Sequence, residues 1–164
     1  MTAYEAAEWS ELFVATAGAA AALAGLVFVA VSINLDRILK FPGLPERALE
    51  TVLLLLTVVI VSVAGLVPGQ STTALGTELL VVGLAIVAGL AGTMRRSLRG
   101  GEAPRSWLVF RVLLLALGSV PFVVGGASVL AEAGGGLYWI AAGIAGAIVA
   151  GVANAWVLLV EIQR

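Results

Sequence analysis

The chain has 164 residues, of which 61% are hydrophobic and only 12% are charged, and its formal net charge is −1. A soluble globular domain averages about 25% charged residues, so this composition excludes that class and predicts an integral membrane protein. The chain contains no Cys and no His, which excludes disulfide bonds and thiolate metal sites and removes the commonest general base and metal ligand. We therefore expect no catalytic residue, no bound metal and no cofactor.

Five apolar runs divide the chain, and each is long enough to cross the roughly 30 Å hydrocarbon core of a bilayer as an α-helix. We expect the spans at about 12–35, 48–67, 75–94, 107–130 and 137–160. Pro121 lies within the fourth run, where it removes the donor for the carbonyl of Leu117 and predicts a kink. The tail before the first run has no Lys or Arg, so we do not expect a cleaved signal peptide. The predicted fold is an all-α polytopic membrane protein of five transmembrane helices, with residues 1–164 forming a single transmembrane helical domain.

Basic residues occupy the first loop, the third loop and the C-terminus, whereas the tail, the second loop and the fourth loop have none. They are Arg37, Lys40, Arg47, Arg95, Arg96, Arg99, Arg105, Arg111 and Arg164. Five spans place all of them on one side of the membrane, and short basic loops are retained in the cytoplasm. We therefore predict an N-out/C-in topology with an acidic outer face made of Glu5, Glu8, Glu11, Glu78 and Glu132. The ratio of eight Arg to one Lys is typical of a GC-rich bacterial source, which predicts a multi-pass protein of the bacterial cytoplasmic (inner) membrane.

The first run carries a narrow face of small residues with polar tips. At seven-residue spacing, Glu11, Gly18, Gly25 and Ser32 share one line of a helix. The adjoining line holds Glu8, Ala15, Ala22, Val29 and Asp36, and the fifth run has a similar face of Gly143, Ala147, Ala150, Asn154 and Glu161. Small faces let helices approach closely in lipid. The commoner role of such a face is packing within one subunit, and the alternative is that it lines a water-filled path or a subunit interface.

Arg111 is the one basic residue inside an apolar run. A charge at the centre of a span costs roughly 2.5–3.5 kcal/mol on insertion scales. Arg111 could extend its side chain to the cytoplasmic interface, or it could form an ion pair with an acid at similar depth. The candidate partners are Asp36, Glu50 and Glu161. We favour Asp36, because Ser32 and Asn34 beside it would complete a polar cluster.

Glu11 and Glu78 come at the outer ends of the first and third spans. In a symmetric assembly each would form a ring of carboxylates, and such rings concentrate cations at pore mouths. In a monomer both would be ordinary solvated acids. Asn154 is a polar residue inside the fifth span and is more often an interhelical hydrogen-bonding residue than a ligand.

The run GLVFVAVSINLDRIL at 25–39, followed by LPERA at 44–48, resembles a family of small multi-pass membrane proteins of high-GC bacteria that have no assigned function. The resemblance covers the first span, its loop and the start of the second span. It implies a membrane protein and assigns no catalytic or ligand-binding residue.

These features favour a homo-oligomeric ion channel or pore, most plausibly conducting inorganic cations, with an acidic outer mouth. Its candidate residues are Glu11, Gly18, Gly25, Ser32, Glu78 and Asn154. The alternative is a non-conducting scaffold or regulatory subunit that binds another membrane protein through the same small faces. We expect membrane lipid as a partner and no nucleic acid. An enzyme is disfavoured because no nucleophile–base set or phosphate-binding loop is present.

Overall fold

The computed structural model describes residues 2–99 and 105–163, with side chains over 3–98 and 108–160. Its regular elements over these residues are all helices: η1 (Thr2–Tyr4), η2 (Ala6–Trp9), α1 (Ser10–Ile33), α2 (Leu35–Ile38), α3 (Leu44–Gly65), α4 (Thr72–Arg99), α5 (Arg105–Leu117), α6 (Val120–Ala131) and α7 (Leu137–Gln163). Five segments are long and apolar enough to cross a membrane: Ala6–Ile33, Leu44–Gly65, Thr72–Leu98, Leu108–Ala131 and Leu137–Val160. The prediction of an all-α chain with five apolar helices long enough to span a membrane is confirmed.

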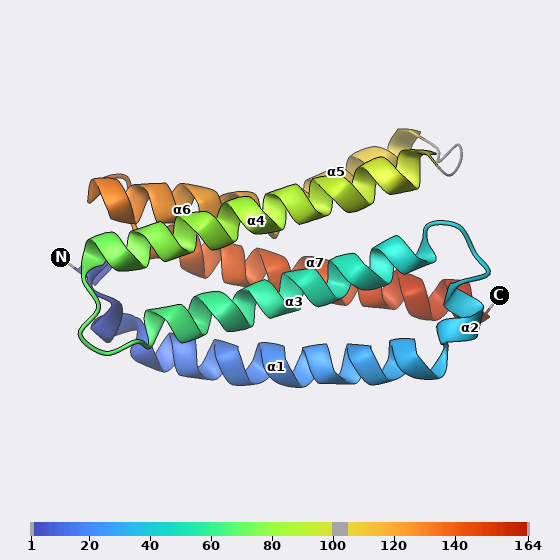
Figure 1. Cartoon of the computed structure of the whole chain (residues 1–164), viewed down its shortest axis with the longest axis horizontal. Coiled ribbons are helices and arrows are strands. Elements are labelled where there is room, and N and C mark those ends of the chain that lie inside the picture. Colours follow the sequence, from blue (N-terminus) through green and yellow to red (C-terminus); the bar gives the residue numbers. More distant parts are fainter. Residues whose placement is uncertain (1, 100–104, 164) are drawn as a thin grey trace.

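The long helices run side by side in one elongated bundle (Figure 1), with α3 at its centre. Helix α3 packs against α1, α4 and α7, while α4 also packs against α6. Buried residues therefore recur on α3 at helical spacing, as at Leu54, Val58 and Val61. By contrast, α1 lies at the edge and is the least buried of the five spans. It touches the bundle mainly through α3, where the ring of Phe13 covers Gly65 and the hydroxyls of Thr16 and Ser62 lie 2.8 Å apart.

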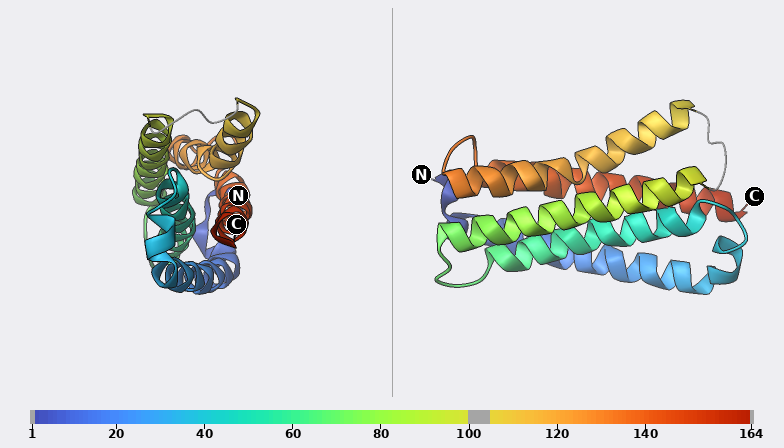
Figure 2. Two further views of the ribbon diagram at one scale, coloured as in Figure 1. Left: turned by 90° about the vertical axis from the view of Figure 1, so that its right-hand side faces the viewer. Right: turned by 45° about the horizontal axis from the view of Figure 1, so that its top comes forward.

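The fourth span is broken rather than only kinked. Helix α5 ends at Leu117 and α6 begins at Val120, one residue before Pro121. Because Pro121 has no N–H, the carbonyl of Leu117 has no helical donor, and this oxygen instead lies against α7 at Gly146. The hydroxyl of Ser119 donates to the carbonyl oxygen of Leu115 at 2.7 Å. The break lets α5 diverge from the line of α6, as the second view in Figure 2 shows.

Glycines allow α4 and α6 to approach backbone to backbone. A Cβ atom at Gly83 would lie 2.8 Å from the backbone nitrogen of Val123, and one at Gly126 would overlap the backbone of Leu80. Contacts this close cannot be relieved by rotating a side chain. The α4–α6 contact therefore requires residues without a side chain at these positions.

The two chain termini lie at opposite ends of the bundle (Figure 1), which we call the N-terminal end and the C-terminal end. At the N-terminal end, the rings of Trp9 and Tyr138 meet edge to face with centroids 4.8 Å apart. The backbone N–H of Gly135 also donates to the hydroxyl of Tyr4 at 3.3 Å. These contacts tie η2 to the first turn of α7 and η1 to the turn that precedes it. An odd number of spans requires the two termini to lie at opposite ends of the bundle.

We predict that Gly126→Ala lowers the free energy of unfolding by roughly 1–3 kcal/mol, because the new methyl group meets the backbone of Leu80. The matched control is Gly92→Ala, also in a helix, where a Cβ meets nothing within 4 Å. That control should be neutral or stabilise by up to about 1 kcal/mol. Unfolding in mixed detergent micelles, followed by Trp fluorescence, measures both. Equal stability of the two variants would contradict the close α4–α6 contact.

Candidate functional site

A buried ion pair joins α3 to α5 in the half of the bundle nearest the C-terminal end. Glu50 lies six residues beyond Leu44, the start of α3, and Arg111 lies six residues beyond Arg105, the start of α5. At 1.5 Å per residue both are roughly 9 Å inside their helices. The side chains of Glu50 and Arg111 are 0% and 8% exposed. Arg111 therefore does not reach out to the interface; it is held inside the protein.

The carboxylate of Glu50 is bound at both oxygens. Arg111 donates through Nη2 to Oε1 at 2.6 Å and through Nε to Oε2 at 3.2 Å. The hydroxyl of Thr93 on α4 lies 2.7 Å from Oε1 and 2.8 Å from the carbonyl oxygen of Leu90. The Nη1 of Arg111 donates to the hydroxyl of Ser97, also on α4, at 2.9 Å. Helices α3, α4 and α5 thus meet at one bidentate guanidinium–carboxylate contact, which is the strongest geometry for such a pair.

This arrangement is suited to holding helices together. Removing a carboxylate or a guanidinium from water costs several kcal/mol, and a pair repays this only with good geometry and extra hydrogen bonds. Glu50 has both. We call Glu50, Arg111, Thr93 and Ser97 the inner lock.

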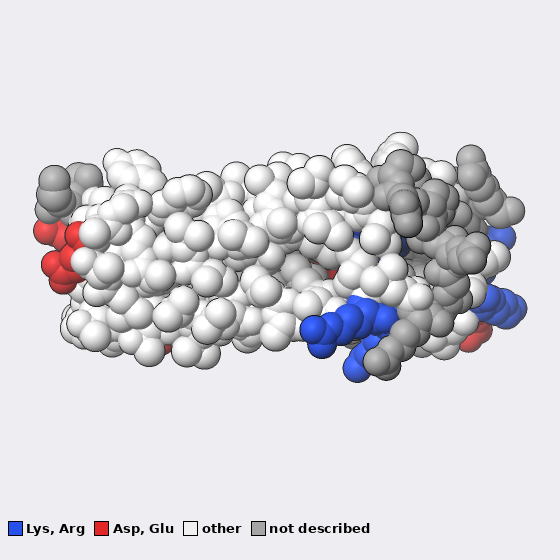
Figure 3. Space-filling view, turned by 90° about the horizontal axis from the view of Figure 1, so that it is seen from above, with Lys and Arg blue, Asp and Glu red and all other residues white. Residues whose placement is uncertain are grey.

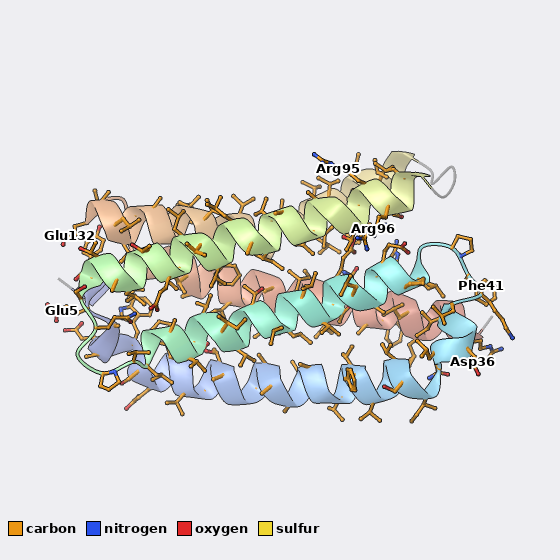
Figure 4. The ribbon with its side chains drawn as sticks, viewed as in Figure 1. Glu5, Asp36, Phe41, Arg95, Arg96 and Glu132 are labelled. Carbon is orange, nitrogen blue, oxygen red and sulfur yellow. The ribbon has the colours of Figure 1, made fainter. Side chains whose placement is uncertain are left out.

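The preference for Asp36 as the partner of Arg111 is wrong. Asp36 is exposed on α2, beyond the end of α1, and Figure 4 places it at the C-terminal tip of the bundle. Its expected polar neighbours bond to their own helix, because Ser32 donates to the carbonyl of Phe28 at 2.8 Å and the Asn34 side chain to that of Ala30 at 2.9 Å. The side chain of Glu161 lies outside the described residues.

The sequence contains a pattern that points to Glu50 as the partner of Arg111. Glu50 shares one helical face with Leu54, Thr57 and Val61, at spacings of four, three and four residues. This is the buried face of α3. An acid in phase with the buried side of a central span is a better partner for an intramembrane Arg than an acid at the end of an edge helix.

Asn154 lies beside the inner lock and is buried inside the subunit. It is 2% exposed, and its amide nitrogen makes no hydrogen bond within the described structure. It lines a cavity of about 150 Å³ together with Arg47, Phe110, Arg111, Leu114, Ala153 and Val157. The rest of its small face, Gly143, Ala147 and Ala150, is buried inside the subunit. The small face of α7 therefore packs within the chain.

The small face of α1 does the opposite and points away from the bundle. Its members Glu11, Ala15, Gly18, Ala22, Gly25, Val29 and Ser32 are all exposed. A Cβ at Gly18 or Gly25 would meet nothing within 4 Å. The two small faces of the chain are thus not partners for each other. We call the exposed set on α1 the α1 small face.

Glu11 and Glu78 both come from the half of the bundle nearest the N-terminal end, but they do not share a face. Most of the visible acids gather at this end in Figure 3, and the visible basic side chains lie at the other. Glu11 and Glu78 are both exposed, and Glu78 accepts a hydrogen bond from the side-chain nitrogen of Gln70 at 2.7 Å. They come from α1 and α4, which lie on different sides of α3 in Figure 1. One axis along α1 would therefore not collect both.

In the described part of the chain, no three His, Cys, Asp or Glu side chains come together as a possible metal site. Comparison with protein-family models, with curated proteins and with solved structures finds no match for this chain. The inner lock and the α1 small face are accordingly its two candidate functional features.

We predict that Glu50→Leu destabilises the protein by roughly 3–5 kcal/mol, because Arg111 is left buried without its counter-charge. Glu50→Leu combined with Arg111→Leu should recover most of that loss, since no charge then remains unpaired. Arg96→Leu is the control, because Arg96 is exposed near the same end; it should change stability by no more than about 0.5 kcal/mol. Denaturation in mixed micelles measures all four proteins. A double variant less stable than Glu50→Leu would rule out the lock.

Proposed function

We propose that this chain is a non-catalytic membrane subunit that associates with another membrane-spanning chain through the α1 small face. The observation that carries the proposal is that Gly18 and Gly25 have no packing role inside the subunit. Glycine in a helix costs roughly 1 kcal/mol relative to alanine. Gly83 of α4 and Gly126 of α6 offset that cost by close contact, whereas Gly18 and Gly25 would gain such a contact from the helix of another molecule.

The chemistry of the face supports close helix–helix contact. Gly18 and Ala22 are four residues apart on this face, and both are exposed. This small-xxx-small spacing lets a second helix approach closely, so that dispersion contacts replace the missing side chains. The core of the subunit is closed by large apolar side chains such as Leu54, Leu79 and Phe122. A function that needs no ion-conducting path through the subunit therefore fits this chain best.

A homo-oligomeric cation pore is the second candidate, and the exposed carboxylate of Glu11 at one tip of the α1 small face favours it. Copies arranged with this face toward a common axis would place a ring of Glu11 carboxylates at the mouth. Because the subunit core is closed, the ions would have to pass between copies.

We predict that wild-type protein, extracted in mild detergent, runs as a complex larger than one subunit. Gly18→Leu with Gly25→Leu should weaken association by about tenfold, which corresponds to roughly 1.4 kcal/mol. It should not lower subunit stability, because a Cβ at either position meets nothing within 4 Å and leucine favours a helix more than glycine does. The matched control is Val14→Leu with Phe28→Leu, at exposed positions of α1 outside the small face. Particle mass from light scattering measures each. A wild-type protein that is monomeric and brings no other chain with it would refute the proposal.

The same preparations separate the two candidates. Cation flux in proteoliposomes that falls on Glu11→Gln would identify the pore, whereas a stable complex without flux would identify the non-conducting subunit. The chain has no native Cys, so single-Cys variants along the α1 small face can be labelled cleanly. Water-accessible labelling along the whole face is expected of a pore, and protection of the face is expected of a helix–helix contact.

We also propose that the N-terminal end faces outward and the C-terminal end faces the cytoplasm of a bacterium. The basic side chains Arg37, Lys40, Arg95 and Arg96 belong to segments at the C-terminal end, which the positive-inside rule assigns to the cytoplasm. We expect Thr73→Cys, at the N-terminal end, to react with a membrane-impermeant maleimide in intact cells. Phe41→Cys, at the other end, should react only after permeabilisation; both positions are exposed. The reverse pattern would invert the topology.

A further inference from the structure

A groove opens between α1, α2 and α7 at the C-terminal end of the bundle. Its volume is about 250 Å³, and its walls come from α1 at Val27, Ala30 and Val31 and from α7 at Ala155, Leu158 and Leu159. The small side chains of Ala30 and Ala155 leave the space between the two helices unfilled. Since α1 and α7 both belong to apolar spans, the groove adjoins the acyl chains of a surrounding bilayer.

The floor of the groove is firmly packed. Ile38 of α2 and Leu158 of α7 are 1% and 5% exposed, and they join Leu44 and Ala48 of α3 in a small hydrophobic cluster. The chain leaves α1 at Asn34, turns, and returns as α2 so that Ile38 closes the base. The groove is therefore held in shape by three helices.

One end of the groove is polar and basic. Arg37 and Asn34 line it there, and the exposed guanidinium of Arg37 makes no hydrogen bond or ion pair with another described residue. Lys40, three residues further on, is also exposed. Asp36 does not line the groove. An apolar slot with an unpaired guanidinium at its mouth matches a molecule with a hydrocarbon tail and an anionic head.

We propose that this groove binds one acyl chain of an anionic phospholipid, whose phosphate is held by Arg37. An apolar cavity of roughly 150 Å³ takes a benzene-sized molecule, so 250 Å³ takes a segment of one acyl chain. A second transmembrane helix fits less well, because one helical turn about 10 Å wide and 5.4 Å long fills more than roughly 400 Å³. The site shares no residue with the α1 small face and does not depend on the proposed function.

The test is native mass spectrometry of the full chain with lipids of identical acyl chains. Phosphatidylglycerol should be retained in preference to phosphatidylcholine. Arg37→Gln should reduce retention of phosphatidylglycerol about fivefold, the factor expected for one basic residue at an anionic membrane surface. It should leave retention of phosphatidylcholine unchanged. Arg95→Gln is the matched control, because Arg95 is an exposed arginine at the same end of the bundle, on α4, and it should retain both lipids as the wild type does.

Filling the groove tests the acyl-chain half of the proposal. Ala155→Phe should reduce retention of both lipids, and Ala30→Phe, which fills the groove from α1, serves as the second variant if the first fails to fold. Inorganic phosphate at millimolar concentration should not displace the lipid, whereas displacement would assign Arg37 to free phosphate. Equal retention of the two lipids, an equal effect of Arg37→Gln and Arg95→Gln, or a dimer that Ala155→Phe dissociates would each overturn the proposal.

Discussion

The contact between the Glu50 carboxylate and the Arg111 guanidinium constrains the rest of this bundle. Glu50 lies on α3, the helix that packs against α1, α4 and α7, and its carboxylate is fully buried. A buried carboxylate is stable only beside a counter-charge and with both oxygens bound. Helix α5 must therefore bring Arg111 to α3, and α4 must bring Thr93 to the same point. The buried carboxylate of Glu50 thus fixes the relative positions of α3, α4 and α5.

The two halves of the bundle are held by different forces. The half near the C-terminal end depends on the polar contacts of the inner lock, while the other half depends on backbone contact between α4 and α6 through Gly83 and Gly126. The break between α5 and α6 makes the two compatible. Pro121 ends the helical hydrogen bonding, so that α6 can stay against α4 while α5 diverges toward the lock. The freed carbonyl of Leu117 is accommodated because α7 has a glycine at position 146.

The same physics gives α1 its special position. Helices in lipid gain little from hydrophobicity alone, because the acyl chains are as apolar as the side chains; they gain from close packing. The small face of α7 is used within the subunit, and that of α1 is left for another molecule. Where α1 and α7 part at the C-terminal end, the space between them is apolar and bordered by Arg37. Both external contacts that we propose thus arise on the least buried span.

The sequence by itself determined the five apolar spans, a kink at Pro121 and the need of Arg111 either for an acidic partner or for access to the interface, because each follows from local composition and backbone chemistry. That the fourth span breaks into α5 and α6 was decided by the tertiary structure. Only the tertiary structure decided that the partner of Arg111 is Glu50 rather than Asp36, because the choice depends on which helices become neighbours. It also decided that the small residues of α7 face inward and those of α1 outward. The pattern of small residues is the same on both helices, because a small face packs against a helix of its own chain and against a helix of another chain through the same contacts.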